Sequence, residues 1–109
     1  MPYTVNGQEL ATDEQGYLLE PDYGDAVADV IAEAEGLTLT EAHWNVLRYL
    51  RDEYREHGQT PNFRHMLKAL AESIPNCDSK MLYELFPGGP AKQGAKVAGL
   101  PQPLGKGGY

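Results

Sequence analysis

Cys77 is the residue whose type and position best suit covalent chemistry. It is the single cysteine among 109 residues, which excludes an internal disulfide and a cysteine-based zinc cage. It precedes a predicted helix that begins near Ser79, and a helix N-terminus can lower the pKa of a nearby thiol. The adjacent carboxylate of Asp78 opposes the thiolate electrostatically. The sequence therefore makes Cys77 a candidate reactive thiol with one favourable and one unfavourable neighbour.

The three histidines do not form a metal-ligand motif. His43, His57 and His65 include no pair at helical metal-binding spacing, and no acid-rich ligand motif accompanies them. No glycine-rich loop follows a predicted strand, so no phosphate cradle is indicated. We therefore expect neither a metal nor a cofactor.

Basic residues in a helix-turn-helix-like pair could contact nucleic acid. Arg64 and Lys68 lie one turn apart on the second predicted helix of that pair. The formal net charge is −7, however, and residues 1–47 hold ten acids and no lysine or arginine. This charge argues against broad nucleic-acid binding, which depends on neutralising phosphates. A DNA-binding regulator is kept as an alternative.

A second basic stripe runs along the preceding helix. Arg48, Arg51 and Arg55 are three and four residues apart and have acids among them. Such a pattern is typical of a solvated helix face with ion pairs inside the helix.

The elements that must position these groups are a hairpin and about five helices. Asn6-Gly7, between short strand-like runs, predicts a type I′ turn. Apolar periodicity and capping residues predict helices within residues 22–36, 37–58, 59–75, 79–86 and 90–99. The expected N-caps are Asp22 or Asp25 for the first helix, Thr40 for the second and Thr60, followed by Pro61, for the third.

The chain is predicted to be one domain, residues 1–98, followed by a flexible arm, residues 99–109. The arm, GLPQPLGKGGY, has two prolines, four glycines and no acid. Its ionisable side chains are those of Lys106 and Tyr109. No apolar run approaches the ~18 residues of a membrane span, and the N-terminus does not resemble a signal peptide. We expect a cytoplasmic protein without a membrane partner.

Three long motifs carry a resemblance to a known family. They are VNGQELATDEQGYL, LTEAHWNVLRYLRDEYREHGQTPNFRHMLKAL and LFPGGPAKQGAKVAGLPQP, which together cover nearly the whole chain. The sequence resembles the DsrC/TusE/DsvC family of sulfur-relay proteins, also called the gamma subunit of dissimilatory sulfite reductase. The resemblance implies a small orthogonal helical bundle with an N-terminal β-hairpin and a flexible C-terminal arm.

The resemblance also implies where the chemistry of the family lies. Family arms follow the pattern Gly-Leu-Pro-x-Pro-x-Gly-Cys, whose cysteine carries sulfur as a persulfide or trisulfide, and a second cysteine follows Pro-Ala-Lys-Gln-x. Here Lys106 and Ala95 occupy the two cysteine positions, so no catalytic residue is carried over and an enzymatic activity is not expected. The matching arm residues, expected to bind a partner together with Lys106, are Gly99, Leu100, Pro101, Pro103 and Gly105.

Three functions are therefore weighed. The first is a DsrC/TusE-like protein that binds or regulates a sulfite-reductase or sulfur-transfer partner without carrying sulfur, because the family is thought to include cysteine-free regulatory members. The second is a sulfur carrier or sulfurtransferase component that acts through Cys77. The third is the DNA-binding regulator that uses Arg64 and Lys68.

Overall fold

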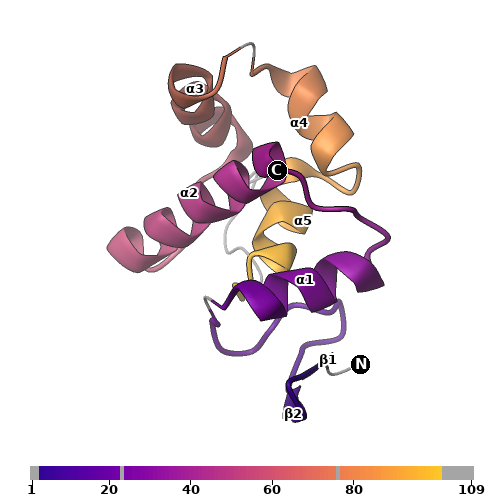
Figure 1. Cartoon of the computed structure of the whole chain (residues 1–109). Coiled ribbons are helices and arrows are strands. Elements are labelled where there is room, and N and C mark those ends of the chain that lie inside the picture. Colours follow the sequence, from indigo (N-terminus) through magenta and orange to yellow (C-terminus); the bar gives the residue numbers. More distant parts are fainter. Residues whose placement is uncertain (1–2, 23, 76, 102–109) are drawn as a thin grey trace.

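The computed structural model describes residues 3–22, 24–75 and 77–101, so the predicted site residues Pro103, Gly105 and Lys106 lie outside these ranges. Within them the chain forms one two-stranded sheet and five helices (Figure 1). The strands are β1 (Tyr3–Val5) and β2 (Gln8–Leu10), and the helices are α1 (Asp25–Ala34), α2 (Glu41–His57), α3 (Phe63–Ser73), α4 (Ser79–Leu85) and α5 (Pro90–Val97). None of these helices is long and apolar enough to cross a membrane. The predicted mainly α bundle with an N-terminal hairpin is confirmed.

The hairpin has the turn that its sequence predicts. Asn6 and Gly7 have φ angles of 51° and 81°, as a type I′ turn requires, and the two strands pair with Tyr3 opposite Leu10. A short isolated hairpin is marginal in water. It is supported here because Val5 and Leu18 belong to the same buried core as the helices. The hairpin lies beyond α1, on the side away from α3 and α4 (Figure 1).

Helix α5 is the centre of the bundle. It contacts each of the other four helices, and in Figure 1 it lies among α1, α2 and α4. Small side chains allow this close packing, and a Cβ atom added at Gly94 would lie 2.9 Å from Cδ1 of Leu50 in α2. Ala91 and Ala95 on the same helix are almost fully buried. The backbone that leads into the predicted arm is therefore anchored in the core.

Two helix starts differ from the predictions. The N-cap of α1 is Gly24 rather than Asp22 or Asp25, and Oδ1 of Asp22 accepts a hydrogen bond from the Gly24 amide at 2.9 Å. The N-cap of α3 is Asn62 rather than Thr60, because the Asn62 side chain accepts from the His65 amide at 2.8 Å. An asparagine directly before the helix is a strong cap, so α3 begins after Pro61 instead of on it.

The N-cap of α2 is Thr40, as predicted. Its capping partner is His43, whose Nδ1 accepts from the Thr40 amide at 3.1 Å. The other ring nitrogen, Nε2, lies 2.8 Å from the Leu85 carbonyl oxygen and donates to it in that tautomer. His43 thus links the start of α2 to the end of α4, which accounts for its burial without a metal.

Candidate functional site

The root of the predicted arm is a helix cap that is packed into the core. Gly99, with φ of 83°, follows α5, and its amide donates to the Lys96 carbonyl at 3.1 Å. The Leu100 amide donates to the Ala95 carbonyl at 3.0 Å. These two bonds form a Schellman motif, in which glycine supplies the left-handed residue. Because Leu100 is fully buried, the first two residues that the sequence analysis assigns to the arm belong structurally to the bundle.

The segment before α1 is hydrogen-bonded to the backbone of this helix cap. The Asp22 amide donates to the Gly99 carbonyl at 2.8 Å. A Cβ atom at Gly99 would collide with the Asp22 carbonyl oxygen, so the approach of the two backbones requires a residue without a side chain. The point from which the chain continues past Pro101 is therefore fixed by two segments that are far apart in the sequence.

Arg51 reinforces the same junction from α2. Its Nε donates to the Ala98 carbonyl at 3.0 Å, its Nη2 to the Gly24 carbonyl at 3.1 Å, and its Nη1 to Oδ1 of Asp25 at 3.0 Å. The side chain is only 6% exposed, whereas that of Asp25 is 77% exposed. The planar guanidinium, with its fork of donors, suits three acceptors on two segments better than an ammonium would.

The prediction that the basic stripe of α2 is a solvated face is therefore wrong for Arg51 and holds for its neighbours. Arg48 donates to Oδ1 of Asn45 at 3.1 Å, and Arg55 pairs with Asp52 at 3.5 Å, both within the exposed surface of α2. Arg51 instead points inward and joins the ends of α1 and α5. Sequence reasoning missed it because its partners are backbone carbonyls 27 and 47 residues away.

Ala95 occupies a closed position beneath this junction. It lies on the core side of α5 with no exposed surface. Its methyl group has no nucleophilic or ionisable atom. Position 95 therefore supplies no thiol near the arm root.

Cys77 is poorly placed for thiol chemistry. It is 8% exposed, and its amide donates to the Ile74 carbonyl at 3.2 Å. Burial, and then the adjacent carboxylate of Asp78, raise the pKa of the Cys77 thiol. Asp78 is itself fixed as the N-cap of α4, accepting from the Met81 amide at 2.8 Å. These facts weigh against the Cys77 carrier, which stays a prediction.

The candidate nucleic-acid residues lie on the surface of α3. Arg64 and Lys68 are both exposed. Between them, Nε2 of His65 lies 3.7 Å from Oε1 of Glu53 in α2. Glu53 thus lies close to His65, on the same helix as the basic pair, and the DNA-binding alternative also stays a prediction.

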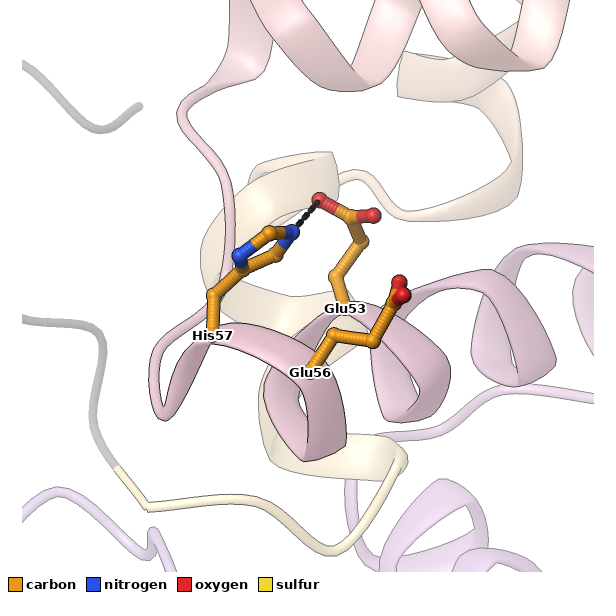
Figure 2. A group of neighbouring side chains, drawn as sticks. All are labelled: Glu53, Glu56 and His57. Carbon is orange, nitrogen blue, oxygen red and sulfur yellow. Dashed lines mark ion pairs between the residues drawn. The ribbon is translucent and has the colours of Figure 1, made fainter.

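Glu53 is the centre of a polar cluster at the end of α2. The ligand atoms of Glu53, Glu56 and His57 lie within 4.8 Å of one another, and these three side chains are drawn in Figure 2. Nε2 of His57 lies 4.0 Å from Oε1 of Glu53, and His65 reaches the same carboxylate from α3. With the histidines protonated, the cluster is an ion-pair network that joins α2 to α3. The spacing of Glu53 and His57, four residues apart, was the signal for it in the sequence.

Comparisons with known proteins agree on one family. The family model described as DsrC like protein matches residues 4–105. The chain is 46% identical over 101 residues to proteins named Sulfurtransferase TusE from Pectobacterium atrosepticum and from Escherichia coli (strain K12), and in each case the match covers 90% of this chain and 93% of the relative.

Solved structures give the same result. The NMR structure of DsrC from Allochromatium vinosum is 43% identical with a TM-score of 0.85, and the match covers 97% of this chain and 99% of that one. The crystal structure of the oxidised gamma-subunit of the dissimilatory sulfite reductase (DsrC) from Archaeoglobus fulgidus is 36% identical with a TM-score of 0.87, covering 96% and 98%. By sequence and by fold, this chain belongs to the DsrC/TusE family.

Proposed function

We propose that this chain binds a sulfur-transfer or sulfite-reductase partner and does so without carrying sulfur on its arm. The observation that carries the proposal is the pair of residues at the positions where the family pattern has cysteines. Ala95 is a buried methyl group, and Lys106 is an amine. Neither side chain can form a persulfide, because both lack a sulfur atom.

The class of partner is inferred from the names of the related proteins. The TusE relatives are named sulfurtransferases, and the relative from Archaeoglobus fulgidus is described as a subunit of dissimilatory sulfite reductase. The arm root of this chain is well defined, with Gly99 and Leu100 capping α5 and Arg51 bonded to Ala98. A chain that keeps the bundle and the arm root but lacks the thiols is suited to occupy a partner's docking surface, and so to regulate access by thiol-bearing relatives.

The bundle surface supplies most of the binding free energy in this proposal. The arm sequence beyond Pro101 holds few apolar groups that could be buried, and interface affinity depends on well-packed anchors rather than on contact area. Removal of residues 101–109 should therefore weaken binding by less than about tenfold, which corresponds to ~1.4 kcal/mol.

The test is a calorimetric titration of a sulfite reductase, and separately of a TusE-type sulfur-transfer complex, with the intact chain and with the chain ending at Leu100. A variant with residues 101–109 replaced by a glycine-serine segment of equal length controls for bulk. Competition against a cysteine-bearing relative measures whether the two share a surface. Complete loss of binding on truncation would overturn the bundle-surface model, and binding by neither form to either complex would overturn the partner class.

A further inference from the structure

Four side chains with metal-ligating atoms meet where α2 ends and α3 begins. Glu53, Glu56 and His57 lie at the end of α2, and their ligand atoms are within 4.8 Å of one another (Figure 2). His65, on the first turn of α3, places its Nε2 atom 3.7 Å from Oε1 of Glu53. Nε2 of His57 lies 4.0 Å from the same oxygen. Two imidazole nitrogens from two different helices therefore face one carboxylate oxygen.

The carboxylate of Glu53 has no permanently charged partner in this cluster. Its side chain is 17% exposed, and both of its ion pairs among the described residues are with imidazoles. An imidazole carries positive charge only when it is protonated, and a partly buried carboxylate without a nearby cation is costly. A divalent ion held by the neutral imidazoles would supply the missing charge. The carboxylates of Glu53 and Glu56 together would offset the two positive charges of that ion.

The donor set selects the class of ion. Imidazole nitrogen combined with carboxylate oxygen suits Zn²⁺, whereas Ca²⁺ and Mg²⁺ bind mainly through oxygen atoms. A tetrahedral Zn²⁺ with bonds of about 2.0–2.1 Å holds its ligand atoms about 3.3 Å apart. The separations of 3.7 Å and 4.0 Å are only slightly longer. Because the side chains of His57 and His65 are 60% and 63% exposed, small rotations at the surface can close the difference.

A hydrogen-bond donor lies one helical turn before this cluster. Oη of Tyr49 is buried and has no hydrogen-bond partner among the described residues. Burial, followed by the charge of Glu53, raises the pKa of Tyr49 to about 12, so the hydroxyl stays protonated within electrostatic range of that carboxylate. Buried hydroxyls in native proteins are nearly always bonded, and this one is available to a water molecule on a bound ion.

We propose that Glu53, Glu56, His57 and His65 bind one Zn²⁺ ion, which joins the end of α2 to the start of α3. The imidazoles bind through Nε2, the atoms that already face Glu53. Histidine spacing within one helix did not indicate this site, because the two imidazoles come from different helices. Since the ligands come together only in the folded chain, the ion stabilises the connection between the helices. The site is separate from the arm and does not depend on the proposed partner binding.

Calorimetric titration of the full chain with Zn²⁺ tests the stoichiometry and the ligands. We expect one ion per chain and at least about tenfold weaker binding in each of His57→Gln, His65→Gln and Glu53→Gln. Glu72→Gln removes an exposed carboxylate in the last turn of α3, so it is the matched control and should bind like the parent chain. Cys77→Ala should also bind equally, because this thiol is not a proposed ligand. Mg²⁺ should show no comparable binding.

Histidine resonances identify the binding atoms. Long-range ¹H–¹⁵N spectra should show Zn²⁺-dependent shifts of the Nε2 signals of His57 and His65. His43 is an internal control, because its Nδ1 accepts from the Thr40 amide and its Nε2 is bonded to the Leu85 carbonyl. The urea midpoint should rise with Zn²⁺ concentration in the parent chain and stay constant in the variant that combines His57→Gln with His65→Gln. The same unfolding curves show whether this double variant is folded without the ion.

Four results would overturn the proposal. The first is the absence of saturable Zn²⁺ binding by the parent chain, and the second is binding that the double histidine variant retains. The third is a stoichiometry of half an ion per chain, which would place the ion between two molecules. The fourth is equal binding of Mg²⁺, which would assign the ion to carboxylates alone. Because no sulfur-pathway protein enters these measurements, their outcome is separate from that of the partner titration.

Discussion

The amide nitrogen of Asp22 lies 2.8 Å from the carbonyl oxygen of Gly99, and this hydrogen bond ties the entry to α1 to the exit from α5. The two backbones are so close that no side chain fits at Gly99. Arg51 bonds to both sides of the same junction, at Gly24 and Ala98. The arm root is thus a three-segment structure whose parts can be tested separately.

Gly99→Ala should destabilise the chain far more than Gly36→Ala. Both glycines follow a helix in the left-handed region, with φ angles of 83° and 76°, so both substitutions carry the same backbone strain of ~1–2 kcal/mol. At Gly36 a Cβ atom meets open space, whereas at Gly99 it collides with the Asp22 backbone. Urea unfolding of the two variants isolates the collision. Equal losses of stability would contradict the close approach.

Arg51→Met should lower the free energy of unfolding by about 1–3 kcal/mol, because it leaves the carbonyls of Ala98 and Gly24 without this donor while filling similar space. Arg48→Met, on the exposed face of the same helix, should change it by less than about 0.5 kcal/mol. Denaturant titrations at equal ionic strength compare the two. If Arg51→Lys is as stable as the parent chain, the forked geometry is unimportant.

Tyr49 should ionise unusually late, and the pKa of Tyr3 is also raised, by burial and then by the charges of Glu35 and Asp13. Burial, followed by the charge of Glu53, raises the pKa of Tyr49 to about 12 from its ordinary value of 10.0. The folded state therefore holds this proton more tightly than the unfolded state, and the stability from this group is complete below pH 10 and is lost as pH rises toward 12. Absorbance titration near 295 nm should show a late step that is absent in Tyr49→Phe. Tyr83→Phe, at an exposed tyrosine, is the control.

Native Cys77 should react slowly with iodoacetamide at neutral pH. The thiolate is the nucleophile, and the pKa of this thiol is raised by burial and by Asp78, so less thiolate is present in the folded chain. The rate should continue to increase above pH 9 and should be much faster in urea at the same pH. Asp78→Asn should accelerate it modestly. Fast native alkylation that matches the unfolded rate would favour the Cys77 carrier.

A persulfide donor should leave the arm of this chain unmodified, because Ala95 and Lys106 contain no sulfur atom. Peptide mass spectrometry after incubation locates any added sulfur. Lys106→Cys in a Cys77→Ala background should acquire an adduct at position 106, which shows that the donor is active. A sulfur adduct within residues 89–109 of the parent chain would refute the prediction, and an adduct at Cys77 would support the second hypothesis.

Local signals in the sequence were sufficient for most of the fold. Asn6-Gly7 specified the hairpin because two successive residues with positive φ are rare without asparagine or glycine. Thr40 was recognisable as a cap because a threonine stands directly before the periodic apolar run of α2. Thr60 was the wrong cap for α3, since a neighbouring asparagine competes for the same helix start and wins by bonding the His65 amide.

The candidate site was predictable only in part. The glycine after α5 was visible as a helix end, but its contact with Asp22 joins residues 77 positions apart and leaves no local trace. Arg51 was wrongly predicted to be solvated for the same reason. Helical spacing shows which residues lie on one face of a helix, but it does not show whether that face contacts carbonyl groups from distant segments.

The fixed junction at Gly99 also limits how far from the bundle the backbone of Lys106 can reach. Leu100 is embedded in the bundle, and the five residue steps from Pro101 to Lys106 can cover at most about 17 Å in a fully extended chain. If a partner's channel receives the arm while the bundle stays outside, the backbone of Lys106 can enter that channel no deeper than this distance. A site that contacts the backbone of Lys106 must therefore lie within this distance of Pro101, which restricts the shape of a partner that would receive the arm.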